Sequence, residues 1–166
     1  MPGPVAAPAG ARSTAARLSA VLVAFDPGRN LGVAFVSESG ELVRHAVFSF
    51  SEFVALHESG SLPAAEWLEL ARTATVLVGD GTGSAAVVAA LRGLGLEPVL
   101  VPEAGTTLEA KALYFADHPP RGLACLVPPG LRSAPVPIDD YAAYAVALRW
   151  LARRGAGEER EGAPPG

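Results

Sequence analysis

Two apolar runs near the start of the chain are joined by only five residues, and this spacing constrains the fold more than any other feature of the sequence. Val21–Phe25 and Leu31–Ser37 are rich in β-branched and aromatic residues, which is typical of strands. A parallel crossover needs roughly a dozen residues or more, so the two strands must form an antiparallel hairpin. Leu42–Phe50 follows a Ser39-Gly40 turn and extends the hairpin to a three-stranded meander.

After residue 50 the pattern changes to alternating helices and strands. Ser51 is expected to cap a first helix, and Pro63–Ala71 carries apolar residues at helical spacing. The later elements are a strand at Thr75–Val78, a helix at Ala85–Leu94, a strand at Pro98–Val101, a helix at Thr106–Phe115 and a last helix from about Ile138. Three antiparallel strands joined to two parallel ones predict an α/β protein, with a mixed five-stranded sheet and helices on both faces. This is the order of elements in the ribonuclease H-like fold.

Length and composition are those of one domain with disordered ends. The chain has 166 residues, of which 50% are hydrophobic. Residues 1–18 and 155–166 are small, charged or rich in Pro and Gly, so we expect a disordered leader, a domain over residues 19–154 and a disordered tail. The single cysteine, Cys125, excludes an internal disulfide and a cysteine-based zinc site, which favours the reducing cytoplasm. No apolar run reaches the roughly 20 residues of a membrane span, and no secretory signal is expected.

The charge of the chain limits how it can hold nucleic acid. The net charge is −4 and the pI is about 5.4. Proteins that bind nucleic acid by neutralising phosphates usually carry a basic excess or a basic face. Any such face on this chain must therefore be local, or must be assisted by metal ions and by a partner.

Five acidic residues fall at the predicted ends of strands and helices. One ends the first strand, one ends the fourth, one lies just past the fifth, and two open the last helix: Asp26, Asp80, Glu103, Asp139 and Asp140. Carboxylates from neighbouring ends can converge on hard divalent cations such as Mg²⁺ or Mn²⁺. The chemistry of such a site would be metal-assisted hydrolysis of phosphodiester bonds.

Each acid also has a local structural role open to it. Asp26 precedes Pro-Gly and suits a turn, and Asp80 suits a loop or a helix cap. The negative charge of Glu103 can interact favourably with the positive N-terminal end of the helix that follows it. Asp139 and Asp140 stand where helix starts prefer acids, so either one alone is more simply a cap. Their joint placement at converging ends is what favours a metal site.

Three blocks of the sequence resemble the YqgF/RuvX family, a group of Holliday junction resolvases and pre-16S rRNA processing nucleases in the RuvC-like branch of the ribonuclease H-like superfamily. The blocks are FDPGRNLGVAFV at 25–36, VPEAGTTLEA at 101–110 and IDDYAAYAVAL at 138–148. The resemblance aligns the acids of the family with Asp26, Glu103 and Asp139. The sequence differs from the family pattern at Pro102, where the family usually has an aspartate, and at Ala104, where it usually has an arginine.

The resemblance implies a metal-dependent nuclease with Mg²⁺ or Mn²⁺ at Asp26, Glu103 and Asp139. Asp80 is an extra acid at a place where RuvC-type sites have a carboxylate, and it would complete the metal set. Asp139 is preferred to Asp140, which would assist, because Asp139 shares a helix face with small alanines. The implied substrates are a ribosomal RNA precursor, cut at the 5′ end of 16S rRNA, or single-stranded or branched nucleic acid.

Two alternatives stay open. One is a Holliday junction resolvase in DNA recombination and repair, which would be expected to work as a homodimer because it cuts two symmetric strands. The other is a catalytically weak module that binds nucleic acid or the ribosome.

Six further residues are candidates for substrate contact. They lie in the first hairpin turn, in the Gly-rich turn after the fourth strand and near Glu103: Arg29, Asn30, Thr82, Thr106, Thr107 and Lys111. The Gly-rich turn is not a Walker A loop, because no Gly-Lys-Ser/Thr follows, so nucleotide triphosphate hydrolysis is disfavoured. Arg149 on the last helix is expected to face solvent and to complement the helix C-terminus.

Overall fold

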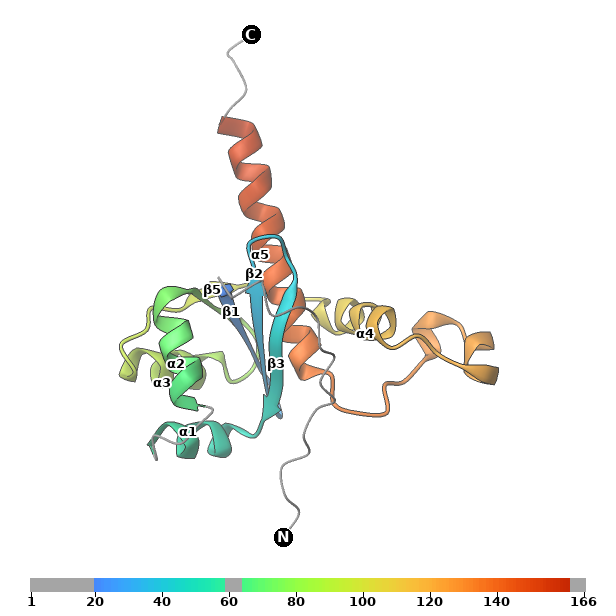
Figure 1. Ribbon diagram of the computed structural model, residues 1–166, viewed down its shortest axis with the longest axis horizontal. Coiled ribbons are helices and arrows are strands. Elements are labelled where there is room, and N and C mark those ends of the chain that lie inside the picture. The colour runs from blue at the N-terminus through green and yellow to red at the C-terminus, as the bar shows by residue number, and fades with distance from the viewer. Residues whose placement is uncertain (1–19, 59–63, 162–166) are drawn as a thin grey trace.

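The computed structural model describes residues 20–58 and 64–161 of the chain. Its centre is one sheet with the strand order β3-β2-β1-β4-β5 (Figure 1). The strands are β1 (Ala20–Pro27), β2 (Leu31–Ser37), β3 (Leu42–Phe48), β4 (Thr75–Gly79) and β5 (Val99–Val101). The first three pair in antiparallel fashion, and β4 pairs in parallel with both β1 and β5. The predicted mixed sheet of three antiparallel and two parallel strands is confirmed.

The central strands are buried on both faces, and their side chains alternate between two cores. Val23 and Phe25 of β1 face one core, whereas Leu22 and Ala24 face the other. This alternation follows from the two-residue period of an extended strand. The direction of each side chain at a strand end is therefore set by its position in the strand.

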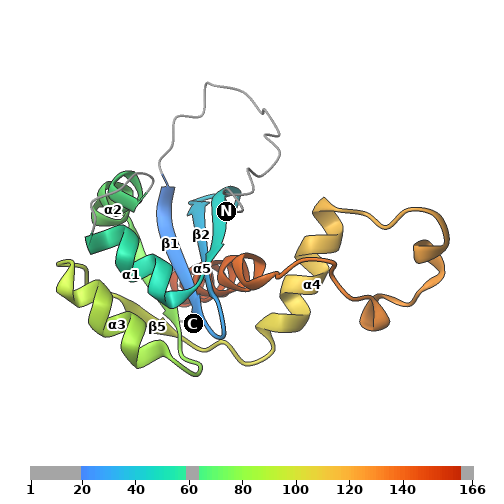
Figure 2. The same ribbon diagram turned by 90° about the horizontal axis from the view of Figure 1, so that it is seen from below.

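Helices cover both faces of the sheet, as predicted (Figure 2). They are α1 (Phe50–Glu58), α2 (Ala64–Thr73), α3 (Ser84–Gly93), α4 (Thr106–Asp117) and α5 (Asp139–Glu161). The core with Val23 contains side chains from α1, α2 and α3, and the core with Leu22 contains side chains from α5. Helix α4 packs on α5 through Ala110, Tyr114, Tyr141 and Ala142. None of the described helices is long and apolar enough to cross a membrane.

The cap of α1 is Ser49, so the prediction of Ser51 was wrong. The Ser49 hydroxyl accepts a hydrogen bond from the Glu52 N–H at 3.2 Å, and the Glu52 carboxylate accepts one from the Ser49 N–H at 2.8 Å. This reciprocal arrangement is a capping box. The pKa of Glu52 is lowered, because hydrogen bonds from the backbone N–H and the side chain of Ser49 favour the charged carboxylate. The Ser-x-x-Glu spacing was visible in the sequence and marks the true helix start.

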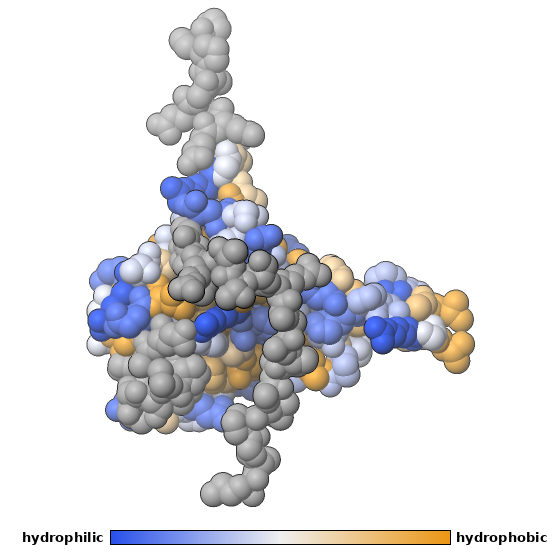
Figure 3. Space-filling view, in the orientation of Figure 1, coloured by the Kyte–Doolittle hydropathy of each residue, from blue (hydrophilic) through white to orange (hydrophobic). Residues whose placement is uncertain are grey.

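Residues 118–138 form an arm that projects from the body between α4 and α5 (Figure 1). Arg132 holds the arm together, because it donates hydrogen bonds to the carbonyls of Val127 at 2.8 Å and Cys125 at 3.3 Å. The tip of the arm is apolar in Figure 3, and the exposed side chains of the arm include Leu123, Leu126 and Leu131. Arg132 is thus a structural residue of the arm.

Helix α5 is longer at its C-terminal end than predicted. It continues to Glu161, so residues 155–161, which were predicted to be part of a disordered tail, are helical. The leader 1–18, residues 162–166 of the tail and Pro63 of the second predicted helix lie outside the described residues.

Candidate active site at the strand ends

Asp26 stands at the end of β1, on the face of the sheet that α5 covers. It continues the series Leu22 and Ala24, whose side chains contact α5, and it pairs across the hairpin with Gly32 of β2. A position at the end of a central strand is rigid on one side and opens to the hairpin turn on the other. The carboxyl group of Asp26 is partly buried there.

Gly32 allows the first turn of α5 to lie directly on β2. A Cβ atom at this position would collide with the backbone of Asp139, so only glycine permits the approach. Since Gly32 is the partner of Asp26, the close approach places Asp139 beside Asp26. Asn30, in the hairpin turn, donates a hydrogen bond from Nδ2 to Oδ2 of Asp139 at 3.3 Å and helps to orient that carboxylate.

Glu103 lies two residues past β5, and its side chain folds back over the end of β4. A Cβ atom at Gly81 would overlap the Glu103 carboxylate, and one at Gly79 would also touch it. The two glycines therefore make the space that this carboxylate fills. Among the described residues, Oε2 of Glu103 is a buried side-chain oxygen that has no hydrogen-bond partner. Such an atom requires a proton or a cation to offset its lost hydration.

The three acids interact, as the pKa of Asp26 shows. It is raised from an ordinary value of 3.8 to about 7. Burial is the largest cause; the charge of Glu103, hydrogen bonding with Glu103 and the charge of Asp139 add to it. Without a cation, Asp26 thus keeps a proton near neutral pH. Three carboxylates from β1, the β5–α4 loop and α5 share one small region.

The acids do not form a complete cation cage in this conformation. Within residues 20–58 and 64–161, no three His, Cys, Asp or Glu side chains are grouped so that they hold a metal ion. The donor set does fit a hard divalent ion, because it consists of carboxylate oxygens with one buried oxygen unpaired. The structure thus brings Asp26, Glu103 and Asp139 together as predicted, and their metal-ligand role stays a prediction.

The carboxylates of Asp80 and Asp140 form hydrogen bonds with groups outside the cluster of Asp26, Glu103 and Asp139 side chains. Asp80 is exposed, and its Oδ1 accepts a hydrogen bond from the N–H of Glu103 at 3.0 Å. Asp140 is buried, and its Oδ2 lies 2.6 Å from Nδ1 of His45 on β3. The bond to Asp140 is the main reason that the pKa of His45 is raised, and it outweighs the burial that would lower it. Consecutive residues of α5 therefore face different elements, and only Asp139 faces Asp26.

The predicted substrate residues differ in accessibility. Arg29, in the hairpin turn, and Thr82, beside Asp80, are exposed near the acids. Thr107 is exposed on the first turn of α4 and Lys111 is half-buried one turn later. Thr106 is buried, with 4% of its surface exposed, and its N–H donates to the Glu103 carbonyl at 2.9 Å, so it begins the helix. Asn30 is engaged with Asp139.

Arg149 was expected to face solvent, but it reaches the acidic region. It donates to both carboxylate oxygens of Glu109 on α4 and, from Nη1, to the carbonyl of Pro102 at 3.1 Å. Only 22% of its side chain is exposed. Because α5 continues to Glu161, Arg149 is an interior helix residue and does not lie at the C-terminus. No local sequence signal could reveal a contact to a carbonyl 47 residues away.

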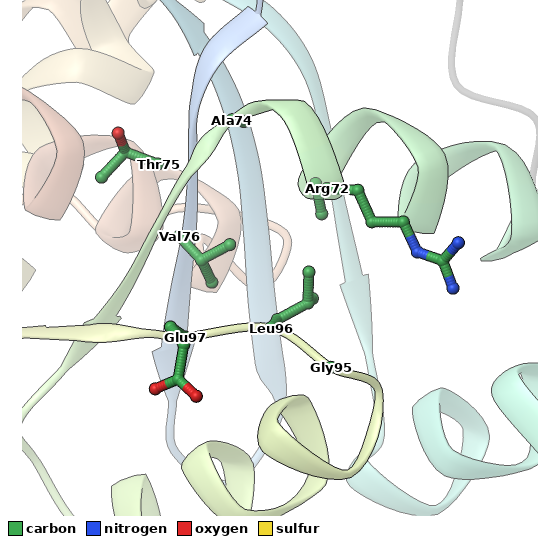
Figure 4. Close-up of a pocket in the computed structure, with 8 residues that line it drawn as sticks. Arg72, Ala74, Thr75, Val76, Gly95, Leu96 and Glu97 are labelled. Atoms are coloured by element: carbon green, nitrogen blue, oxygen red, sulfur yellow. The ribbon is translucent and has the colours of Figure 1, made fainter.

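An open pocket also exists, but it lies around the start of β4, at the opposite end of that strand from Asp80 (Figure 4). Its lining includes Thr75 at the start of β4, whereas the acids lie beyond the end of β4. The side chains of Arg72 and Glu97 extend to different sides in the close-up. The pocket is separate from the acidic site.

The comparisons with known proteins give remote structural likeness. No family model and no curated protein matches the chain. A structure of RuvC from Thermus thermophilus is 19% identical, with a TM-score of 0.47, over 81% of this chain and 96% of that chain. RuvC of T. thermophilus in complex with a Holliday junction substrate is 22% identical, with a TM-score of 0.39, over 81% and 95% of the two chains.

Proposed function

We propose that this protein is a metal-dependent nuclease that hydrolyses phosphodiester bonds in nucleic acid. The observation that carries the proposal is the convergence of Asp26, Glu103 and Asp139 from three separate elements on one partly buried spot. The like charges of these carboxylates oppose folding, and the charges of Glu103 and Asp139 add to burial in raising the pKa of Asp26. A divalent cation would remove the repulsion and would also give Oε2 of Glu103 the partner that it lacks.

Each residue of such a site would have its own role. Asp26 and Glu103 would hold Mg²⁺ or Mn²⁺, with Asp139 as the third carboxylate. A bound ion supplies an activated water and stabilises charge on the leaving oxygen. Asn30 keeps the Asp139 carboxylate oriented through its hydrogen bond. Arg29, in the turn after β1, and Thr82, in the turn after β4, are both exposed and are suited to contact the phosphates on either side of the cut bond.

The sequence resemblance to the YqgF/RuvX family suggests which substrate is preferred. We propose the 5′ end of a 16S rRNA precursor, or other single-stranded or branched nucleic acid. Cutting of a Holliday junction by a homodimer is the alternative. The net charge of −4 supports a site in which cations, and not a broad basic face, draw in the phosphates.

The test is a cleavage assay on labelled single-stranded RNA, single-stranded DNA and a four-way junction, with Mg²⁺, Mn²⁺ or EDTA. We expect cleavage that requires the metal and is lost in Asp26→Asn. Glu38→Gln is the matched control, because Glu38 is an exposed acid in the β2–β3 turn at the other end of β2. Cleavage by a folded Asp26→Asn variant at the wild-type rate would contradict the proposal. Binding of the substrates without cleavage would favour the catalytically weak module.

A further inference from the structure

The peptide group between Pro102 and Glu103 is hydrogen-bonded at both of its ends. Its carbonyl, on Pro102, accepts from Nη1 of Arg149 at 3.1 Å. Its N–H, on Glu103, donates to Oδ1 of Asp80 at 3.0 Å. One partner comes from α5 and the other from the end of β4, so this single peptide group is held between two layers of the fold.

The Arg149 side of this arrangement is itself held in place. Nε donates to the two carboxylate oxygens of Glu109 at 3.0 and 3.1 Å, and Nη2 donates to Oε1 at 2.6 Å. A two-pronged pair of this kind fixes the plane of the guanidinium. Gly105 leaves room for it, since a Cβ atom there would lie 3.3 Å from Nη2. With Nε and Nη2 occupied by Glu109, Nη1 is directed at the Pro102 carbonyl.

The Asp80 side is also tied to the strand beside it. The N–H of Asp80 donates to the carbonyl of Val101 at 3.0 Å, which continues the pairing of β4 with β5 by one step. The carboxylate of Asp80 then accepts from Glu103. Gly79 and Gly81 on either side leave open the space into which the Glu103 side chain folds. Asp80 thus contacts the backbone that carries the acid, and Glu103 occupies the place beside Asp26.

We propose that Asp80 and Arg149 are positioning residues that hold the Pro102–Glu103 peptide group so that the Glu103 carboxylate stays beside Asp26. The burial of the unpaired Oε2 of Glu103 beside other carboxylates favours movement of the β5–α4 loop away from the sheet when no cation is bound. The two hydrogen bonds oppose this movement and keep the site ready for the ion. The inference rests on the proposed function, since it concerns the same metal site, and it gives Asp80 a role other than metal ligand.

A role of Asp80 as a metal ligand and a role as a positioning residue predict different results for one substitution. In Asp80→Asn the amide oxygen can still accept from the Glu103 N–H, whereas a neutral amide is a poor substitute for a metal-binding carboxylate. Asp80→Ala removes the acceptor. For Arg149, Arg149→Ala removes the donor, and Arg149→Lys keeps the charge but loses the fork on Glu109. Arg153→Ala is the control, because Arg153 is an exposed arginine on the same helix.

The experiment measures Mn²⁺ binding to the full chain by titration calorimetry without nucleic acid, together with hydrogen exchange of the Glu103 amide and the thermal midpoint. We expect Asp80→Ala and Arg149→Ala to weaken Mn²⁺ binding about tenfold, the range typical of groups that orient metal ligands. Glu103 amide exchange should accelerate in Asp80→Ala. Asp80→Asn should bind like wild type, Arg149→Lys should be intermediate, and Arg153→Ala should be unchanged.

Two results would overturn the inference. If Asp80→Asn loses Mn²⁺ as fully as Asp26→Asn does, Asp80 is a ligand. If Asp80→Ala and Arg149→Ala lower the thermal midpoint but bind Mn²⁺ like wild type, the bonds are merely structural. Failure of the proposed function looks different, because then wild type and Asp26→Asn alike show no Mn²⁺ binding.

Discussion

Gly32 on β2 lies against the backbone of Asp139, and this contact brings the start of α5 to the acid at the end of β1. A Cβ atom at residue 32 would collide with the carbonyl and peptide carbon of Asp139. The obstacle is backbone, which cannot rotate away as a side chain can. The spacing between helix and sheet at the candidate site therefore depends on the absence of a Cβ atom at Gly32.

Gly32→Ala should destabilise the protein by about 1–3 kcal/mol, the usual cost of overpacking, and should impair cleavage because Asp139 moves away from Asp26. The control is Gly93→Ala at the end of α3, where an added Cβ meets nothing within 4 Å and alanine favours the helix. Urea unfolding and the cleavage assay measure both effects. An unchanged unfolding midpoint in Gly32→Ala would show that the helix can shift at no cost.

Asp26→Asn should stabilise the metal-free protein at high pH. The folded-state pKa of Asp26 is about 7, above the ordinary 3.8, so the folded protein keeps a proton that the unfolded chain releases. The stability of the wild type therefore falls as pH rises from about 4 to about 7. Asparagine stays neutral, so the gain should be near zero at pH 4 and about 1–3 kcal/mol at pH 8. Urea unfolding in EDTA at the two pH values checks this, and a gain independent of pH would contradict it.

Asp139→Asn and Asp140→Asn should separate the roles of these neighbours. The first should abolish cleavage with little loss of stability, since Asp139 faces Asp26 and, within residues 20–58 and 64–161, its carboxylate accepts a side-chain hydrogen bond from Asn30 alone. The second should keep cleavage within a few-fold but cost about 1–3 kcal/mol, because Asp140 is buried and bonded to His45 and to the Tyr141 N–H. Cleavage rates and urea midpoints of both variants decide the matter. Loss of cleavage in Asp140→Asn alone would reverse the assignment.

The pair of His45 and Asp140 should add stability at acidic pH. The pKa of His45 is raised above 6.5, chiefly by the bond to Asp140 and further by the charges of Asp140 and Asp117. Its contribution is complete below 6.5 and is lost as pH rises through the folded-state pKa. NMR titration of the His45 ring should show this raised pKa in wild type and a lower one in Asp140→Asn. The same value in both proteins would contradict a role for Asp140.

The sequence predicted the elements and the candidate acids because those signals are local. The five-residue link between Phe25 and Leu31 compelled a hairpin, and the later alternation of helix and strand gave the mixed sheet that the structure has. The cap of α1 was misplaced although Ser49 and Glu52 form a local motif, so that error lay in the interpretation and not in the signal.

The alternation of side chains along the strands also indicated on which face of the sheet each acid lies. Asp26 follows Leu22 and Ala24, and Glu103 follows Val101, at two-residue steps that lead to the face under α5. Asp80 follows Val76 and Val78, whose side chains face the opposite core. This difference agrees with the structure, in which Glu103 approaches Asp26 and Asp80 contacts the backbone of Glu103 instead.

By itself, then, the sequence determined which segments are strands and helices and which acids stand at their ends, because periodicity and turn chemistry act over a few residues. Only the tertiary structure decided which acids meet. The seating of Asp139 on Gly32, the folding of Glu103 over Gly79 and Gly81, and the reach of Arg149 to Pro102 join residues far apart in the chain. Such contacts depend on how closely whole elements pack, and this is a property of the assembled layers that no single segment encodes.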